Sequence, residues 1–192
     1  MKFNKIIALM LALVMGALCF ASCGEETEIP EGMQLASNEF VSYKFYVPDD
    51  WMIDTTKEGF LSAKASDNSN VSVQTMTYGG MYGSLSEYFR TDYFKKVEST
   101  FKTVTLIEEE SSEENQTVGT LKNPAVKYVY VVESDGATYK IMQYFTYNAG
   151  YLYAITYTGK IKDTGRNGEI VEVDYFNDHL EQIASVIDNF VF

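Results

Sequence analysis

Two turn signals divide residues 125–158 into three strand-like runs, and this pattern constrains the fold more than any other. Asp135-Gly136 is a residue pair that favours a two-residue hairpin, and Asn148-Ala149-Gly150 provides a second turn. The runs beside them are rich in valine, isoleucine and tyrosine, which are typical of strands. We therefore expect an antiparallel meander with strands at 125–133, 138–147 and 151–158.

Shorter strands and two helices complete the pattern. Apolar runs bounded by turn residues predict strands at 43–47, 51–53, 59–65, 70–78, 103–108 and 116–121. Ser84 and Glu87 form a capping-box pair before a helix with apolar residues at four-residue spacing as far as Phe101. A second helix is expected from about Asp174 to Asp188. The order of elements predicts an α+β domain, a mostly antiparallel β-sheet flanked by helices.

Two patches resemble PsbP-like domains. Residues 43–51 resemble the opening of that family, where a Tyr-x-Phe strand runs into Pro-x-x-Trp. Residues 154–158, with 186–192 at the end of the chain, resemble its last long strand and closing segment. The family includes an extrinsic subunit of photosystem II and lipoproteins of non-photosynthetic bacteria. The resemblance covers residues 39–192, with 160–173 as an insertion, and implies an α/β/α sandwich but no catalytic or ligand residues.

The start of the chain has the features of an export signal. Lys2 and Lys5 precede an uncharged apolar run from Ile6 to Leu18, which is short for a membrane span. Phe20-Ala21-Ser22-Cys23 then resembles the lipobox of bacterial lipoproteins. The resemblance implies that Cys23 receives a diacylglycerol and becomes the N-terminus, on the extracytoplasmic face of the cell membrane. The alternatives are a plain secretory signal cleaved nearby and an uncleaved anchor.

These features divide the chain into a signal peptide (1–22), a lipidated acidic tether (23–38) and one α+β domain (39–192). The tether is acidic, poor in aromatic residues and without periodicity. Without residues 1–22, which contain two lysines and no acid, the chain has 13 basic and 27 acidic residues, a net charge of −14. This charge repels phosphate backbones, so nucleic acid is not expected as a partner. Cys23 is then the only cysteine, which excludes an internal disulfide.

Residues 163–174 resemble a twelve-residue calcium loop and form the candidate metal site. Calcium needs six to eight oxygen ligands and a glycine that permits the sharp turn, here Gly168. Gly165 lacks an oxygen ligand at the third position, and Arg166 adds a positive charge. The alternative is a surface hairpin without any cofactor. The candidate ligands are Asp163, Asn167, Glu169 and Asp174.

Tyrosines gather on neighbouring strands of the expected meander. Tyrosine combines a large contact area with a polar tip, which suits a recognition surface. Because β-sheets are enriched in tyrosine, the alternative is a core or a helix-covered face. The candidate binding surface consists of Tyr128, Tyr130, Tyr139, Tyr151 and Tyr153.

The sequence carries no recognised catalytic motif. His179 is the only histidine, so the usual histidine dyads and zinc sites lack a second member. We therefore expect a non-catalytic binding or accessory module, held at the membrane through Cys23, with an unknown protein or small ligand as its partner. The alternative is an extracytoplasmic hydrolase that uses two carboxylates. Two acids in one apolar cleft, one with a raised pKa, would favour the hydrolase.

Overall fold

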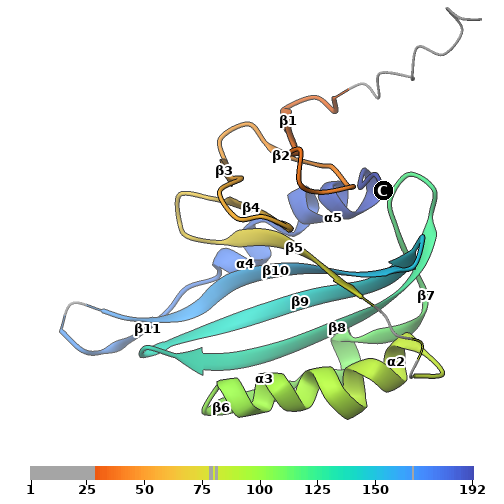
Figure 1. The fold of residues 1–192 in the computed structure, drawn as a ribbon. Coiled ribbons are helices and arrows are strands. Elements are labelled where there is room, and N and C mark those ends of the chain that lie inside the picture. Colours follow the sequence, from red (N-terminus) through yellow and green to blue (C-terminus); the bar gives the residue numbers. More distant parts are fainter. Residues whose placement is uncertain (1–28, 78–79, 81, 166) are drawn as a thin grey trace, which may run out of the picture.

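The computed structural model describes residues 29–77, 80, 82–165 and 167–192. Most of its strands join one nine-stranded sheet, in which every pair is antiparallel (Figure 1). The strands are β3 (Met52–Asp54), β4 (Phe60–Lys64), β5 (Asn70–Thr77), β6 (Thr103–Leu106), β7 (Ser112–Val118), β8 (Asn123–Ser134), β9 (Ala137–Asn148), β10 (Tyr151–Thr164) and β11 (Ile170–Glu172). Their order is β3-β4-β5-β10-β9-β8-β6, with β7 paired to β8 and β11 paired to β10.

The long strands β8, β9 and β10 form the meander that the turn signals predict. Asp135 and Gly136 have φ angles of 52° and 77°, the left-handed conformation that a type I′ hairpin requires at both positions. Ala149 and Gly150 make the second turn in the same way, with φ angles of 48° and 90°. β10 continues past its expected end at residue 158 because its last residues pair with β11.

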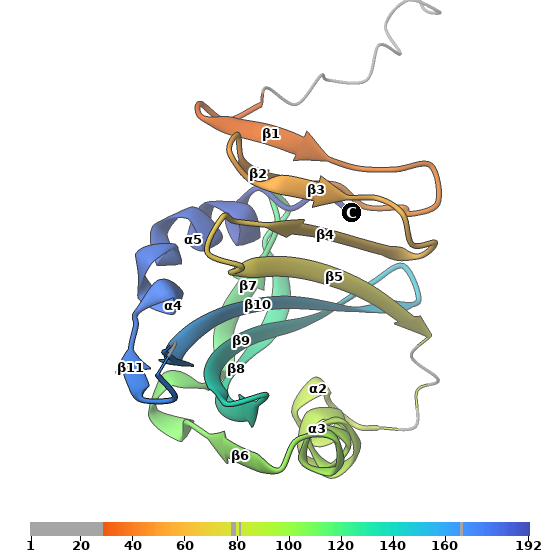
Figure 2. The ribbon, with the colours of Figure 1, turned by 90° about the vertical axis from the view of Figure 1, so that its left-hand side faces the viewer.

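Helices cover both faces of the sheet (Figure 2). One face carries α2 (Leu85–Tyr88), η1 (Phe89–Tyr93) and α3 (Phe94–Thr100), which follow one another as a single rod. The other face carries α4 (Tyr175–Asp178) and α5 (Leu180–Asp188). The fold is therefore α+β, a mostly antiparallel sheet between helices, and the expected fold class is confirmed.

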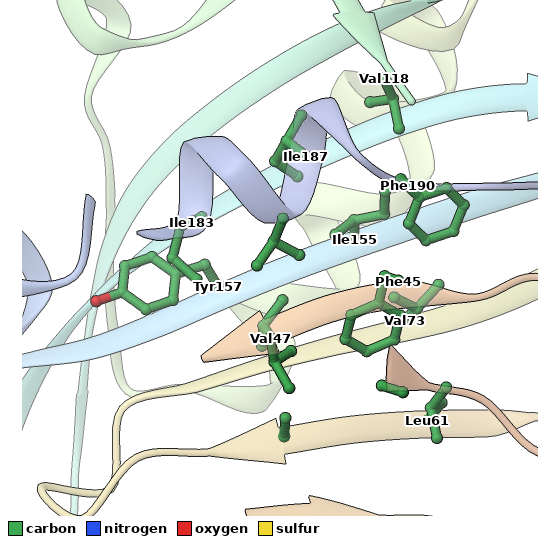
Figure 3. Packing of buried hydrophobic residues seen from close by; sticks show 14 of the residues in the cluster. Phe45, Val47, Leu61, Val73, Val118, Ile155, Tyr157, Ile183, Ile187 and Phe190 are labelled. Atoms are coloured by element: carbon green, nitrogen blue, oxygen red, sulfur yellow. The ribbon is translucent and has the colours of Figure 1, made fainter. Parts of the chain in front are cut away.

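The core on the α4–α5 side joins these helices to the middle of the sheet (Figure 3). Ile183 and Ile155 are almost fully buried there. The Tyr157 hydroxyl, at the edge of this core, donates hydrogen bonds to the carbonyls of Tyr175 (3.1 Å) and Phe176 (2.9 Å). A buried polar atom thus ties α4 to β10, which satisfies a hydroxyl that burial would otherwise leave unpaired.

The core on the α2–α3 side is mostly aromatic. Phe89 stacks on Tyr128 with ring centroids 3.5 Å apart and planes within 4°. Phe145 meets Tyr93 edge-on, with centroids 4.9 Å apart. Aromatic pairs of this kind contribute roughly 0.5–1.5 kcal/mol each beyond the area they bury. These contacts fix the helical rod against β8 and β9.

The first helix begins as its capping box predicts but is not a regular α-helix. The Ser84 hydroxyl accepts a hydrogen bond from the Glu87 amide at 3.0 Å. A π-turn, η1, then interrupts the rod. Apolar residues at strict four-residue spacing drift around a helix of 3.6 residues per turn, and a wider π-turn returns them toward one face. The second helix is likewise divided, at His179, into α4 and α5.

The domain begins earlier than residue 39. β1 (Met33–Ala36) pairs antiparallel with β2 (Phe45–Pro48) in a separate two-stranded sheet. The Gln34 side chain donates a hydrogen bond to the Trp51 carbonyl at 2.6 Å, which ties β1 to the chain just before β3. The prediction that residues 23–38 are all tether is therefore wrong for β1. β1 forms because it pairs with β2, since its own sequence has no strand pattern.

Candidate functional site

A groove of about 570 Å³ lies over β3, β4 and β5. It lies on the α2–α3 side of the sheet, because the lining residue Ser72 is connected by strand register through Thr156 to Gln143, which contacts Tyr93 of η1. Its size is within the range of ligand-binding clefts. Side chains from all three strands line it, among them Met52, Asp54, Phe60, Ser62, Lys64, Asn70 and Ser72.

One row of polar side chains crosses five strands on this face. Asp54 is the register partner of Ser62, which is in turn opposite Ser72. Ser72 is opposite Thr156 on β10, and Thr156 is opposite Gln143 on β9. Register partners point to the same face of a sheet. Because Asp54 is exposed and Gln143 is only 1% exposed, the row leads from the open groove to the layer beneath the helical rod.

Gln143 forms the buried end of the row and is fully hydrogen-bonded. Its amide nitrogen donates to the Tyr93 hydroxyl (2.7 Å) and to the Thr156 hydroxyl (2.8 Å). Its carbonyl oxygen accepts from the Tyr130 hydroxyl at 3.1 Å. Burial raises the pKa of both Tyr93 and Tyr130, so both phenols stay protonated at neutral pH. Gln143 and its hydrogen bonds therefore fix β9, β10 and η1 relative to one another.

The open end of the groove carries charges of both signs. The Asp54 carboxylate accepts hydrogen bonds from the hydroxyl (2.6 Å) and the amide (2.9 Å) of Thr56, which hold the pKa of Asp54 below its usual value. Lys57 lies over the Phe60 ring, 5.4 Å from its centroid. Asp54 and Lys64 are the two charged residues in the lining and balance each other. The groove is therefore close to neutral in a strongly acidic chain.

The lining suits the binding of a polar ligand more than proton transfer. Serine, threonine and asparagine side chains can donate and accept hydrogen bonds, while Met52 and Phe60 provide apolar contact. A general acid at neutral pH needs a raised pKa. Every described carboxyl group whose pKa is clearly shifted has it lowered instead. The feature that would favour a carboxylate hydrolase is thus absent from the described residues.

Three of the five tyrosines expected to form a binding surface are buried. Tyr128 (0% exposed) and Tyr130 (3%) lie beneath the helical rod, and Tyr153 (2%) belongs to the core on the opposite face. The surface hypothesis is wrong for these three, because helices and the C-terminal segment cover both faces. Tyr139 is half-buried, and Tyr151 is 48% exposed at the turn between β9 and β10.

The candidate calcium loop has the geometry of its alternative, a surface hairpin. The Asp163 carboxylate receives a hydrogen bond from Lys160 at 2.8 Å, and that of Asp174 receives one from Asn177 at 3.0 Å. Asn167 and Glu169 are exposed near the turn. Within the described residues, no group of three or more His, Cys, Asp or Glu side chains could hold a metal ion. These contacts do not test calcium binding at the hairpin, and a bound ion would have to displace Lys160 from the Asp163 carboxylate.

His179 is held between two polar partners. One ring nitrogen lies 2.8 Å from the Asp67 carboxylate and the other 2.7 Å from the Gln182 side-chain oxygen. Burial alone lowers the pKa of His179, but the hydrogen bonds to Gln182 and Asp67 outweigh burial and raise it overall. Its ring also meets the edge of Trp51, with centroids 5.2 Å apart. His179 therefore joins the start of α5 to the turn between β4 and β5.

Sequence reasoning missed the groove and Gln143. A signal for the groove exists in β4 and β5, where small or polar residues alternate with the buried Leu61, Ala63, Val71 and Val73. Gln143 sits in an apolar strand without any neighbouring polar pattern. Its three partners come from other segments, so only the folded arrangement shows that they meet.

Cys23 lies outside the described residues. In the described part of the chain, no helix is long and apolar enough to cross a membrane.

Neither a family model nor a curated protein matches this sequence. Among solved structures, one similar chain is a protein of Bacteroides thetaiotaomicron, 14% identical with a TM-score of 0.39. That similarity covers 77% of this chain and 44% of the Bacteroides protein, so this chain spans less than half of its length. Another is LpqN of Mycobacterium tuberculosis, described as involved in cell envelope biogenesis, 13% identical with a TM-score of 0.41. That similarity covers 83% of this chain and 92% of LpqN.

Proposed function

We propose that this protein is a lipoprotein of the extracytoplasmic membrane face and that its domain is a non-catalytic binding or accessory module. The observation that carries the proposal is Cys23, placed directly after Ala21-Ser22 at the end of a basic and then apolar leader. A diacylglycerol on the sulfur supplies two acyl chains, and stable anchoring needs more than one. The resemblance of residues 43–51 to the opening of PsbP-like domains supports kinship with the lipoproteins of that family.

The groove over β3–β5 is the surface that we assign to binding. Its lining is rich in hydroxyl and amide groups, its two charges balance, and the polar row that starts in it ends at the buried Gln143. These features suit a neutral, polar ligand or the polar surface of a partner protein.

Mass spectrometry of the protein purified from its native host tests the anchor. The expected species begins at Cys23 and carries a diacylglycerol, and the Cys23→Ala variant is no longer acylated. Cys19→Ala is the matched control, because Cys19 lies in the removed peptide and its loss leaves the mature mass unchanged. An unmodified Cys23 thiol in the native material contradicts the proposal.

Photocrosslinking in intact cells tests the groove. A photoreactive residue at position 72, in the middle of the groove, is expected to capture a partner, and the same residue at Ser99, on the exposed side of α3, is not. Ser62→Arg should abolish the capture from position 72, since a long charged side chain fills the groove. Equal capture from both positions would show that the groove is not the binding surface.

A further inference from the structure

Three loops at one end of the sheet carry a cluster of exposed apolar side chains. The loops are residues 37–42, the turn 119–122 between β7 and β8, and the segment 148–151 that begins β10 (Figure 1). We call these loops the tips. The exposed side chains on or beside them are Phe40 (58% exposed), Leu121 (77%), Tyr147 (48%) and Tyr151 (48%).

Two of the tips lie side by side, and the third lies at the same end of the sheet. Tyr151 is the register partner of Asn148, and Phe40 and Tyr151 line the same hollow. The pair Ala125–Thr146 sets the start of β8 beside the end of β9, which brings the 119–122 turn to this end. Four of the nine large hydrophobic side chains that are exposed in the described residues therefore gather here. A cluster of this kind marks an interaction surface more than scattered residues do.

The tips are also free of net charge. Their fourteen residues include one acid, Glu39, and one base, Lys122, in a mature chain of net charge −14. Lys122 is paired with Asp188 at 2.8 Å. Most of this acidic molecule is repelled by anionic lipid, but this end is not. Aromatic and leucine side chains without a charge excess are the groups that enter the interfacial layer of a bilayer.

The chain between the domain and Cys23 brings the bilayer within reach of the tips. Ile29, the first described residue, is six residues after Cys23, a distance of at most about 20 Å for an extended chain. β1 follows, and its last residue, Ala36, leads directly into the tip loop with Phe40. A lipid on Cys23 therefore leaves the tips within reach of the membrane surface.

We propose that the tips contact the lipid bilayer, with Phe40, Leu121, Tyr147 and Tyr151 in its interfacial layer. The proposal rests on the lipid anchor of the proposed function and adds an orientation to it. An acyl anchor with a second, weaker membrane contact is held longer and in one pose. The opposite end of the sheet provides an internal control, since Ile170 (72% exposed) and Val171 (41%) on β11 are equally exposed and apolar.

Hydroxyl-radical footprinting on vesicles tests the contact. The mature chain, residues 23–192, is coupled through its single thiol to a maleimide lipid in phosphatidylcholine vesicles, and its oxidation is compared with that of the same chain free in solution. Phe40, Leu121 and Tyr151 should become protected, while Ile170 and Val171 should be oxidised as before. Equal change at both ends, or protection of the β11 end, overturns the proposal.

Two further comparisons make the result specific. In the double variant Phe40→Ser/Leu121→Ser, the protection of Tyr147 and Tyr151 from oxidation should fall severalfold. The double variant Ile170→Ser/Val171→Ser should leave that protection unchanged. Protection that rises with the density of protein on the vesicle would identify a second copy as the occupant and also overturn the proposal. Chemical coupling fixes Cys23 at the bilayer whether or not the host acylates it. A lack of protection at the tips would therefore refute the bilayer contact alone, whereas an unmodified Cys23 in native material would refute the lipid anchor.

Discussion

Replacing Gln143 by methionine is expected to destabilise the domain strongly although methionine has a similar volume. The change removes two donated hydrogen bonds, to Tyr93 and Thr156, and one accepted from Tyr130. Tyr130 is 3% exposed, and a buried hydroxyl without a partner costs about 1–3 kcal/mol. Tyr93 and Thr156 are half-buried, and each lost bond there costs about 0.5–1.5 kcal/mol. The expected loss in the free energy of unfolding is about 2–6 kcal/mol.

Urea denaturation provides the assay, because Trp51 is the only tryptophan, is 2% exposed and reports unfolding by its fluorescence. Thermal denaturation followed by the same fluorescence should show a Tm lower by about 5–15 °C for a domain of this size. Gln74→Met is the matched control, since Gln74 lies on the same face of the sheet but is exposed. Its effect should remain within about 0.5 kcal/mol.

A double-mutant cycle separates the hydrogen-bond explanation from a packing defect. Tyr130→Phe alone leaves the Gln143 carbonyl oxygen unpaired and should cost about 1–2 kcal/mol. In the Gln143→Met background, the same change removes a hydroxyl that already lacks its partner, so it should cost less. We expect a coupling of about 1–2 kcal/mol. Two effects that add within about 0.5 kcal/mol would refute the reasoning.

Three further predictions concern His179, Gly159 and the 163–174 hairpin. The raised pKa of His179 makes its contribution to stability complete below about pH 6.5 and lost as the pH rises through the folded-state pKa. The lowered pKa of Asp67 acts oppositely, because the contribution of Asp67 to stability is lost as the pH falls through its folded-state pKa. Asp67→Asn should therefore flatten the plot of stability against pH on both sides, as measured by denaturation at several pH values. Gly159→Ala should lower the free energy of unfolding by about 1–3 kcal/mol, since the added Cβ would lie 2.5 Å from the Phe176 Cα and α4 would have to move; an unchanged urea midpoint would contradict this. Millimolar calcium should leave the Tm unchanged in both the wild type and Asp163→Ala, because Lys160 already occupies the Asp163 carboxylate; a shift only in the wild type would restore the calcium loop.

The strands and helices could be predicted from the sequence because their signals are local. Asp135-Gly136 sets a turn whatever the rest of the chain does, and the capping box at Ser84 begins its helix in the same way. β1 carries no such signal and forms only because β2 lies beside it.

The candidate sites were harder to predict because they depend on which segments meet. The sequence left open whether Tyr128 and Tyr130 form a surface or a helix-covered face, and only the folded arrangement shows the helical rod over them. The polar row that starts in the groove continues from β5 to Thr156 on β10, a strand that begins more than seventy residues after β5 ends. Gln143 lies in an apolar strand, and its hydrogen-bond partners belong to η1, β8 and β10, so the sequence alone does not identify it.

The proposed anchor, the proposed bilayer contact of the tips and the groove together predict which partners this domain would serve. β5 runs from Asn70, in the groove, to Thr77, the register partner of Tyr151 at the tips. The seven steps between these two residues span about 23 Å, so with the tips on the bilayer the Asn70 end of the groove would stand roughly that far from the membrane surface. A freely diffusing solute would gain nothing from this placement. A ligand that is itself part of the envelope would gain, since two partners confined to one thin layer meet at a raised effective concentration. The two proposals together therefore predict an envelope-bound partner rather than a soluble one.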